Sequence, residues 1–202
     1  LYLPVKKFID TIKNIWSIED LRNRILTTLL LILIYRVGSY IVLPGIDANL
    51  LDNFSEKSNQ GILGLFNMFA GGSFSRASIF ALGIMPYISA SIAIQLLTIA
   101  VPYFQKLQKE GESGRKKITQ YTRLLTVVVT AFQASAYVAY LRNQSGGAII
   151  AEYGTFFFWL STTVILTAGT LFVMWLGEKI TDKGIGNGTS IIIMVGILAR
   201  LP

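Results

Sequence analysis

Few residues in this sequence are able to carry catalytic chemistry. The 202 residues include no cysteine and no histidine, which excludes disulfides, thiolate metal sites and cysteine nucleophiles and removes the commonest general base and metal ligand. Composition therefore disfavours a serine hydrolase, a rhomboid-like protease or a zinc protease. The motif GIGNGTS at residues 184–190 has the glycines of a phosphate-binding loop. No strand precedes it and its spacing is not that of a Walker motif, so we interpret it as a turn that opens a helix.

A short apolar segment, interrupted by glycines, is apolar enough to leave water but too short to cross a bilayer. A helix over residues 61–70, GILGLFNMFA, would be ~15 Å long, half the hydrocarbon thickness of a bilayer. A glycine pair that permits a left-handed turn follows, and then polar side chains that are poor neighbours for lipid: Gly71, Gly72, Ser73, Ser75 and Arg76. Non-helical backbone at membrane depth survives only inside protein or along a watery cavity. We therefore expect a re-entrant segment shielded from lipid; a surface loop with a short interfacial helix is the alternative.

The next helix begins with apolar residues at helical spacing. Pro86 suits its first turn, and Ile84 and Ile88 are four residues apart, so they share a face if the helix begins early enough. Mild polarity without charge follows at Ser89, Ser91 and Gln95. A pore lined by such apolar residues would seal by dewetting and offer no specific binding site. The alternative is that the isoleucines only pack one helix against another.

Composition places these segments in a membrane protein. Hydrophobic residues make up 52% of the chain and charged residues 14%, against roughly a quarter charged in ordinary soluble domains. Apolar runs predict an all-α, polytopic bundle with spans at residues 22–43, 77–103, 120–142, 154–177 and 187–202. Residues 1–20 form a basic amphipathic pattern typical of a helix in the membrane interface; a soluble helix packed on a partner is the alternative. Arg36 lies near the far end of the first span, where it can snorkel.

The distribution of positive charge predicts the orientation. The net charge of +7 would alone suggest a nucleic acid partner. One side of the predicted spans, however, carries thirteen lysines and arginines: Lys6, Lys7, Lys13, Arg22, Arg24, Lys106, Lys109, Arg115, Lys116, Lys117, Arg123, Lys179 and Lys183. The other side carries three: Lys57, Arg76 and Arg142. This asymmetry predicts a cytoplasmic N-terminus and explains the net charge, so no direct nucleic acid partner is expected.

Two features of this topology bear on function. The basic segment at residues 106–123 is expected to be a cytoplasmic loop with Gly111 and Gly114 as turn residues; it either docks a soluble partner or only fixes the topology. Five is an odd number of spans, so a second similar block would enter the membrane upside down. Inverted repeats of this kind are a recurring transporter architecture.

Four motifs resemble the SecY family, the channel subunits of the bacterial protein translocase. They are YRVGSYIVLPGID, FNMFAGGSFSRASIFALGIMPYISASIAIQLL, KEGESGRKKITQYTR and MWLGEKITDKGIGNGTSIII. The resemblance runs from about residue 24 to residue 202 in the same order and spacing. The family's chain has ten spans in two inverted halves, so this sequence resembles the N-terminal half.

The resemblance implies roles for particular residues. Residues 61–76 match the plug that closes the channel from outside, and its candidate residues are Leu65, Phe66, Asn67, Met68, Phe69, Gly71, Gly72, Ser73 and Arg76. The hydrophobic pore ring is matched by Ile84, Ile88 and Ile193, with Thr189 at an adjacent position where relatives usually carry isoleucine. The lateral gate is matched by Ser89, Ile92 and Gln133. The partner loop comprises Lys106, Lys109, Arg115, Lys116 and Lys117.

The family implies a function and partners as well. We expect a subunit of the bacterial cytoplasmic membrane, neither an enzyme nor cofactor-dependent, that passes unfolded secretory chains across and inserts membrane proteins. Its expected partners are SecE, SecG, the SecA motor or the ribosome, the unfolded chain and membrane lipids. The competing class is an inverted-repeat secondary transporter of a small solute, which would need a charged or metal-binding site at the midplane. A purely structural membrane scaffold is a third possibility.

Overall fold

The structure, a computed structural model, describes residues 16–47, 51, 61–144 and 155–199. These residues are helical apart from their turns and one isolated antiparallel bridge between Val42 and Ser78. The helices are α2 (Glu19–Gly38), α4 (Gly61–Phe69), α5 (Met85–Ala100), α6 (Pro102–Lys109), α7 (Glu112–Gln144), α8 (Thr155–Lys183) and α9 (Gly188–Leu198). The prediction of an all-α helix bundle is confirmed.

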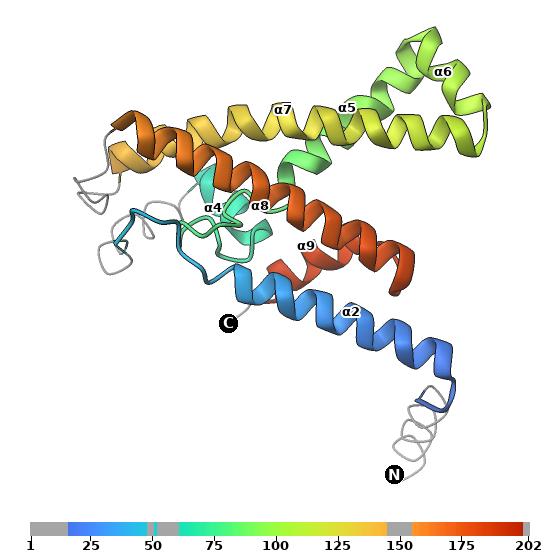
Figure 1. The fold of residues 1–202 in the computed structure, drawn as a ribbon, viewed down its shortest axis with the longest axis horizontal. Coiled ribbons are helices and arrows are strands. Elements are labelled where there is room, and N and C mark those ends of the chain that lie inside the picture. Colours follow the sequence, from blue (N-terminus) through green and yellow to red (C-terminus); the bar gives the residue numbers. More distant parts are fainter. Residues whose placement is uncertain (1–15, 48–50, 52–60, 145–154, 200–202) are drawn as a thin grey trace.

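The long helix α7 lies between α5 and α8, and α8 in turn packs against α2 and α9 (Figure 1). The short helix α4 sits on α9. One buried cluster joins the chain after α4 to α7 and α8, around Phe74, Tyr137 and Phe158. A second joins α2, α8 and α9, around Tyr35 and Ile192. The chain between α4 and α5 contributes to both clusters and therefore holds the bundle together.

Helix α5 does not fill the second predicted span, residues 77–103, and the membrane crossing of that span remains a prediction. Residues 77–84 form turns rather than helix, and this backbone pairs with the chain after α2, where the Leu43 amide donates to the Ala77 carbonyl at 2.9 Å. Helix α5 begins only at Met85, with Pro86 in its first turn, as the sequence indicates. It ends at Ala100 because Pro102 favours an extended conformation at Val101 (ψ 120°). The axis bends there by 96°.

The basic segment at residues 106–123 forms a helical hairpin, and its place as a cytoplasmic connection between two spans remains a prediction. Helix α6 runs to Lys109 and α7 starts at Glu112, so only Glu110 and Gly111 make the turn. Gly111 has the positive φ (72°) expected of a turn glycine. Gly114, by contrast, is a helical residue that packs directly against the Leu107 carbonyl, where a Cβ would overlap.

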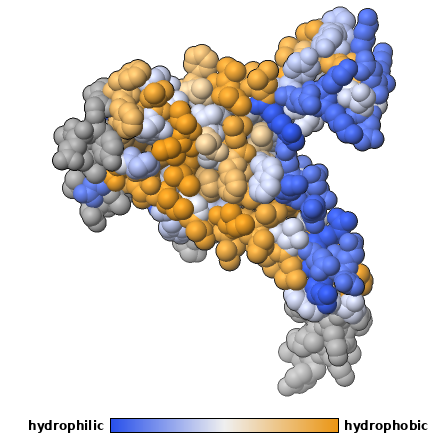
Figure 2. Space-filling model, viewed as in Figure 1, coloured by the Kyte–Doolittle hydropathy of each residue, from blue (hydrophilic) through white to orange (hydrophobic). Residues whose placement is uncertain are grey.

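Among the described residues, α7 and α8 are long and apolar enough to cross a membrane, and the bent pair α5 and α6 makes a third candidate. Helices also stand at the first and last predicted spans, where crossing remains a prediction. Helix α2 ends at Gly38 rather than residue 43, and α9 is an apolar helix of 11 residues. Hydrophobic residues cover the middle of the visible face, and hydrophilic residues gather over the α6–α7 hairpin and at the far ends of α2 and α8 (Figure 2). The predicted interfacial helix at residues 1–20 falls largely outside the described residues.

Candidate plug and constriction

The predicted plug contains a short helix closed by a glycine turn. Helix α4 ends at Phe69, and Gly71 and Gly72 both adopt positive φ, 63° and 81°. The Gly71 amide donates to the Met68 carbonyl at 3.0 Å, and the Gly72 amide donates to the Asn67 carbonyl at 2.8 Å. This pattern is a Schellman motif, which satisfies carbonyls that the helix end leaves free. The prediction that the glycine pair ends the helix is confirmed.

The chain after the plug helix is buried. Ala70, Gly71, Gly72, Ser73, Phe74 and Ser75 are all buried, and Arg76 is half-buried. The Asn67 side chain is fully buried and accepts a hydrogen bond from the Ser75 amide at 3.0 Å. The surface-loop alternative is therefore wrong for residues 70–75, because irregular backbone is enclosed by protein as a membrane-embedded segment requires. The depth of this segment in the membrane remains a prediction.

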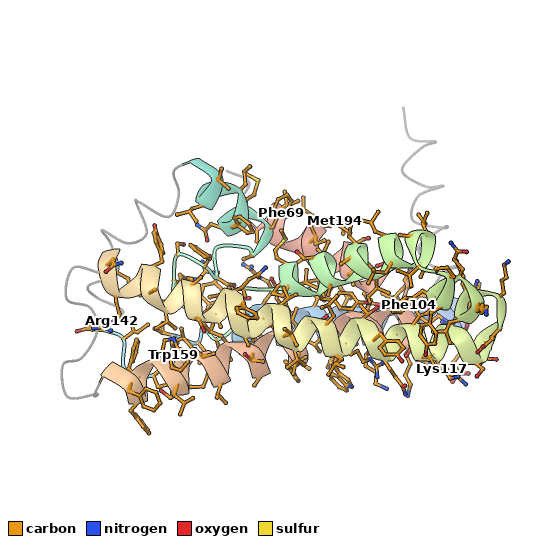
Figure 3. All side chains as sticks on the ribbon, turned by 90° about the horizontal axis from the view of Figure 1, so that it is seen from above. Phe69, Phe104, Lys117, Arg142, Trp159 and Met194 are labelled. Carbon is orange, nitrogen blue, oxygen red and sulfur yellow. The ribbon has the colours of Figure 1, made fainter. Side chains whose placement is uncertain are left out.

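One face of α4 is apolar and exposed among the residues that the structure describes. Leu65, Phe66 and Met68 are 55%, 40% and 43% exposed. On its other side α4 reaches α9, where Phe69 and Met194 lie close to each other (Figure 3). The contact depends on Gly196, since a Cβ there would lie 2.7 Å from the Phe69 carbonyl oxygen and 3.3 Å from the Gly71 amide nitrogen. Sequence reasoning missed Gly196, whose only local signal is an isolated glycine in an apolar helix.

Two of the predicted ring-region residues, Ile84 and Thr189, lie next to one glycine of α8, Gly177. Ile84 is the N-cap residue of α5 and is buried, and Ile88 lies one turn later with its amide bonded to the Ile84 carbonyl at 3.1 Å. A Cβ at Gly177 would lie 3.4 Å from Ile84 Cδ1 and 3.5 Å from Thr189 Cγ2. Ile193 is half-buried against the same cluster. The structure thus brings the start of α5 and the start of α9 together on α8.

A cavity of about 440 Å³ opens beside these residues. Ile88, Ile92 and Thr189 line it together with polar and charged side chains: Tyr87, Ser91, Gln95, Thr119, Arg123, Glu178, Thr181, Asp182 and Asn187. Ile84, by contrast, faces the core in this half of the bundle. The isoleucines thus stand next to a polar cavity, which we call the vestibule. That they form a constriction remains a prediction.

The vestibule contains an ion pair that the sequence reasoning missed. Arg123 of α7 binds Glu178 of α8 with Nε–Oε1 at 3.0 Å and Nη2–Oε2 at 2.7 Å. Two parallel bonds of this kind combine charge with fixed geometry. Both residues flank apolar runs on the same predicted side of the membrane. This shared position is the feature of the sequence that could have indicated the pair. Asn187 beside them caps α9, with its Oδ1 accepting from the Thr189 and Ser190 amides, so the predicted helix-opening turn is confirmed.

The predicted lateral gate residues do not form one cluster here. Ser89 is exposed and its hydroxyl donates to the Met85 carbonyl at 3.1 Å. Ile92 lines the vestibule. Gln133 of α7 lines a different, apolar cavity of about 350 Å³ with Phe66 and Met85. Ile92 of α5 and Gln133 of α7 thus line different cavities, and the joint role of the three residues remains a prediction.

The basic residues of the predicted partner loop lie on the α6–α7 hairpin. Lys106, Lys109, Arg115, Lys116 and Lys117 are all exposed, and Lys117 stands at the opposite end of the bundle from Arg142 and Trp159 (Figure 3). Lys116 pairs with Glu112 at 3.1 Å and Lys117 with Glu110 at 3.8 Å. Exposed pairs of this kind contribute ~0–1 kcal/mol, so they leave the cations available to a partner. Within the described part of the chain, no cluster of three metal-ligating side chains occurs.

Comparison with known proteins identifies the family. The SecY family model matches residues 78–202, more than half of the chain. The chain belongs to the SecY family. It is 48% identical to the protein translocase subunit SecY of Buchnera aphidicola subsp. Schizaphis graminum over 199 residues, covering 98% of this chain and 45% of that protein.

Two further SecY relatives agree. The protein translocase subunit SecY of Escherichia coli K12 is 51% identical over 186 residues, covering 92% of this chain and 42% of the relative. That of Rickettsia typhi is 49% identical over 188 residues, covering 92% and 43%. The chain therefore spans about half the length of the curated SecY relatives it matches.

Proposed function

We propose that this chain is the N-terminal half of a protein-conducting channel subunit. The channel passes unfolded secretory chains across the membrane and releases apolar helices sideways into lipid. The observation that carries the proposal is the near-complete match of this chain to proteins named protein translocase subunit SecY. The arrangement of α4, α5 and α9 supports it, because a short helix with an exposed apolar face stands beside the predicted apolar constriction.

In this mechanism the closed channel is sealed twice. Helix α4 blocks the passage, and Ile84, Ile88 and Ile193 form this half's share of an apolar ring, with Thr189 beside it. Apolar walls exclude ions by dewetting yet grip a passing chain only loosely. Opening displaces α4 and separates the two halves at the lateral gate, to which Ser89, Ile92 and Gln133 belong. No catalytic step is involved, and partners supply the energy.

We further propose the orientation and partners that the charge distribution supports. The N-terminus and the α6–α7 hairpin lie on the cytoplasmic side of the bacterial cytoplasmic membrane. The exposed cations of that hairpin then face a soluble partner, the SecA motor or the ribosome. SecE and SecG complete the complex in the membrane.

The competing hypothesis, a secondary transporter of a small solute, requires a charged solute-binding site near the midplane of the membrane. In the vestibule Arg123 and Glu178 pair with each other, which leaves Asp182 as the other charged residue of the lining, and the predicted ring residues are uncharged. Saturable uptake of one small solute by the complete protein would favour the transporter.

Ion conductance of the complete protein in its complex, measured in a planar bilayer, tests the proposal. Removing residues 62–69 takes away the plug helix and leaves the buried residues 70–76, so resting conductance should rise. Ile88→Gly should also raise it, because it widens the ring. Ile99→Gly is the matched control, since Ile99 lies on the same helix but is 73% exposed. Unchanged conductance in both test variants would overturn the channel assignment.

A further inference from the structure

One arginine ties the chain after the plug helix to α2. We call residues 70–76 the plug joint. Arg76 Nη2 donates to the Gly71 carbonyl at 3.0 Å, and its Nε donates to the Ser39 carbonyl at 3.3 Å. The same guanidinium stacks over the Tyr40 ring, 4.5 Å from its centroid. A single side chain therefore makes two contacts with the chain at the C-terminal end of α2, to Ser39 and Tyr40, and a third within the joint, to Gly71.

The glycine at the centre of the joint has little freedom to move. A Cβ at Gly71 would lie 3.1 Å from Arg36 Nη1 on one side and 3.1 Å from the Gly196 Cα on the other. Its amide is bonded to Met68 and its carbonyl to Arg76. The glycine pair thus supplies the left-handed conformation that the Schellman turn requires, and it is packed too closely to serve as a loose hinge.

The Tyr40 ring contacts two guanidinium groups, those of Arg36 and Arg76. Arg36 also lies over this ring, at 5.6 Å, and its Nη2 donates to the Tyr40 hydroxyl at 3.4 Å. The negative face of an aromatic ring attracts a guanidinium, so the ring brings together two like charges that would otherwise repel. Tyr40 itself is 60% exposed, which makes it a site where substitution is tolerated by the fold.

The other end of the plug helix is open by comparison. A Cβ at Gly61 would meet no atom within 4 Å among the described residues, and Ile62 is 75% exposed. Leu63 packs on the core cluster from the first half of α4, while the close backbone contacts lie at its C-terminal end, where Phe69 meets α9 and the joint meets α2. If the plug is displaced as in the proposed function, this C-terminal end is where α4 would stay attached.

We propose that Arg76, acting through Tyr40 and the Ser39 carbonyl, is the positioning residue that holds the plug joint against α2 and so keeps the plug closed. The glycine pair is then a fixed pivot for the plug. This inference rests on the proposed channel function, because it assigns a gating role to a residue outside the constriction.

The test uses the complete protein in its complex and two pairs of variants. Arg76→Gln and Tyr40→Leu each remove the stacked pair and should raise the open fraction at rest by about tenfold, which corresponds to ~1.4 kcal/mol. Tyr40→Phe keeps the aromatic ring, so the channel should stay closed at rest. Arg76→Lys keeps the positive charge but loses the planar guanidinium with its several donors, so its open fraction should lie between those of the wild type and Arg76→Gln. Arg142→Gln, an exposed arginine outside the joint, is the matched control.

A distance measurement separates this inference from the channel assignment. Spin labels on cysteines introduced at Leu65 and Met194, both exposed, report the position of α4 relative to α9. The inference predicts a longer or broader distance distribution in Tyr40→Leu and an unchanged one in Tyr40→Phe, whatever the conductance does. Wild-type distances in both Tyr40→Leu and Arg76→Gln would overturn it. If the distances change but the plug deletion leaves conductance unchanged, the channel assignment fails and the positioning role stands.

Discussion

At the scale of single residues, glycines decide how closely the segments of this chain approach each other. Gly188, at the start of α9, packs directly on the Gly177 carbonyl of α8, and its amide donates to the Thr181 hydroxyl at 2.9 Å. Gly196 allows the same close approach between α9 and the plug joint. Small residues permit helices to approach closely in membranes, where dispersion and hydrogen bonds replace the hydrophobic effect between helices.

Two glycine substitutions should differ sharply in their effect on stability. A Cβ on Gly188 would overlap the Gly177 carbonyl and lie 2.9 Å from Ile180 Cβ, so Gly188→Ala should destabilise the fold by ~1–3 kcal/mol through overpacking. A Cβ on Gly177 would meet its neighbours at 3.4 Å and beyond, so Gly177→Ala should change stability by less than ~1 kcal/mol. Thermal unfolding of the complete protein in detergent measures both. Equal losses would show that α9 is not seated on this carbonyl.

At the scale of elements, sequence reasoning succeeded where a local signal decides the structure. The glycine pair, Pro86 and Asn187 each mark a helix end through their own backbone or side-chain chemistry. It did not predict the turns at residues 77–84, where an apolar run is held by pairing with residues 41–43, distant in sequence. It failed again at Gly114, because the Leu107 carbonyl that the glycine admits belongs to another helix.

The candidate site shows the same division. The residues of the plug and ring were predicted from the resemblance to the SecY family. The residues that pack against them were not predicted. The roles of Gly196 and of the Arg123–Glu178 pair depend on contacts across the bundle. Spacing along the chain does not predict such contacts. The lateral gate residues remain apart in this half of the bundle.

The ion pair between α7 and α8 should contribute measurably to stability. Arg123 is half exposed but Glu178 is only 20% exposed, and the pair is bidentate. We expect a coupling of ~1 kcal/mol between Arg123→Gln and Glu178→Gln, at the upper end for partly exposed pairs. A double-mutant cycle on unfolding measures it. The exposed pair Lys117–Glu110, at 3.8 Å, is the control and should show almost none; the reverse order would contradict the geometry.

At the scale of the whole molecule, the described residues form a bundle with an apolar middle and a charged end. One of its faces is apolar and exposed. Hydrophilic residues gather at the end that carries the α6–α7 hairpin (Figure 2), as expected for the side that faces soluble partners. The exposed apolar side of α4 and the vestibule beside Ile88 lack facing partners among the described residues. The chain spans about half the length of its SecY relatives.

Crosslinking of a secretory chain arrested during transport tests the central claim most directly. A photoreactive amino acid is placed in the complete protein at Ile88 or Ile193, next to the constriction, or at Leu33 on the outer side of α2, which is 62% exposed and lines a separate apolar groove. We predict that the arrested chain crosslinks to positions 88 and 193 and not to position 33. Absence of crosslinks at both ring positions, or equal crosslinking at position 33, would contradict the account of this bundle as half of a protein-conducting channel.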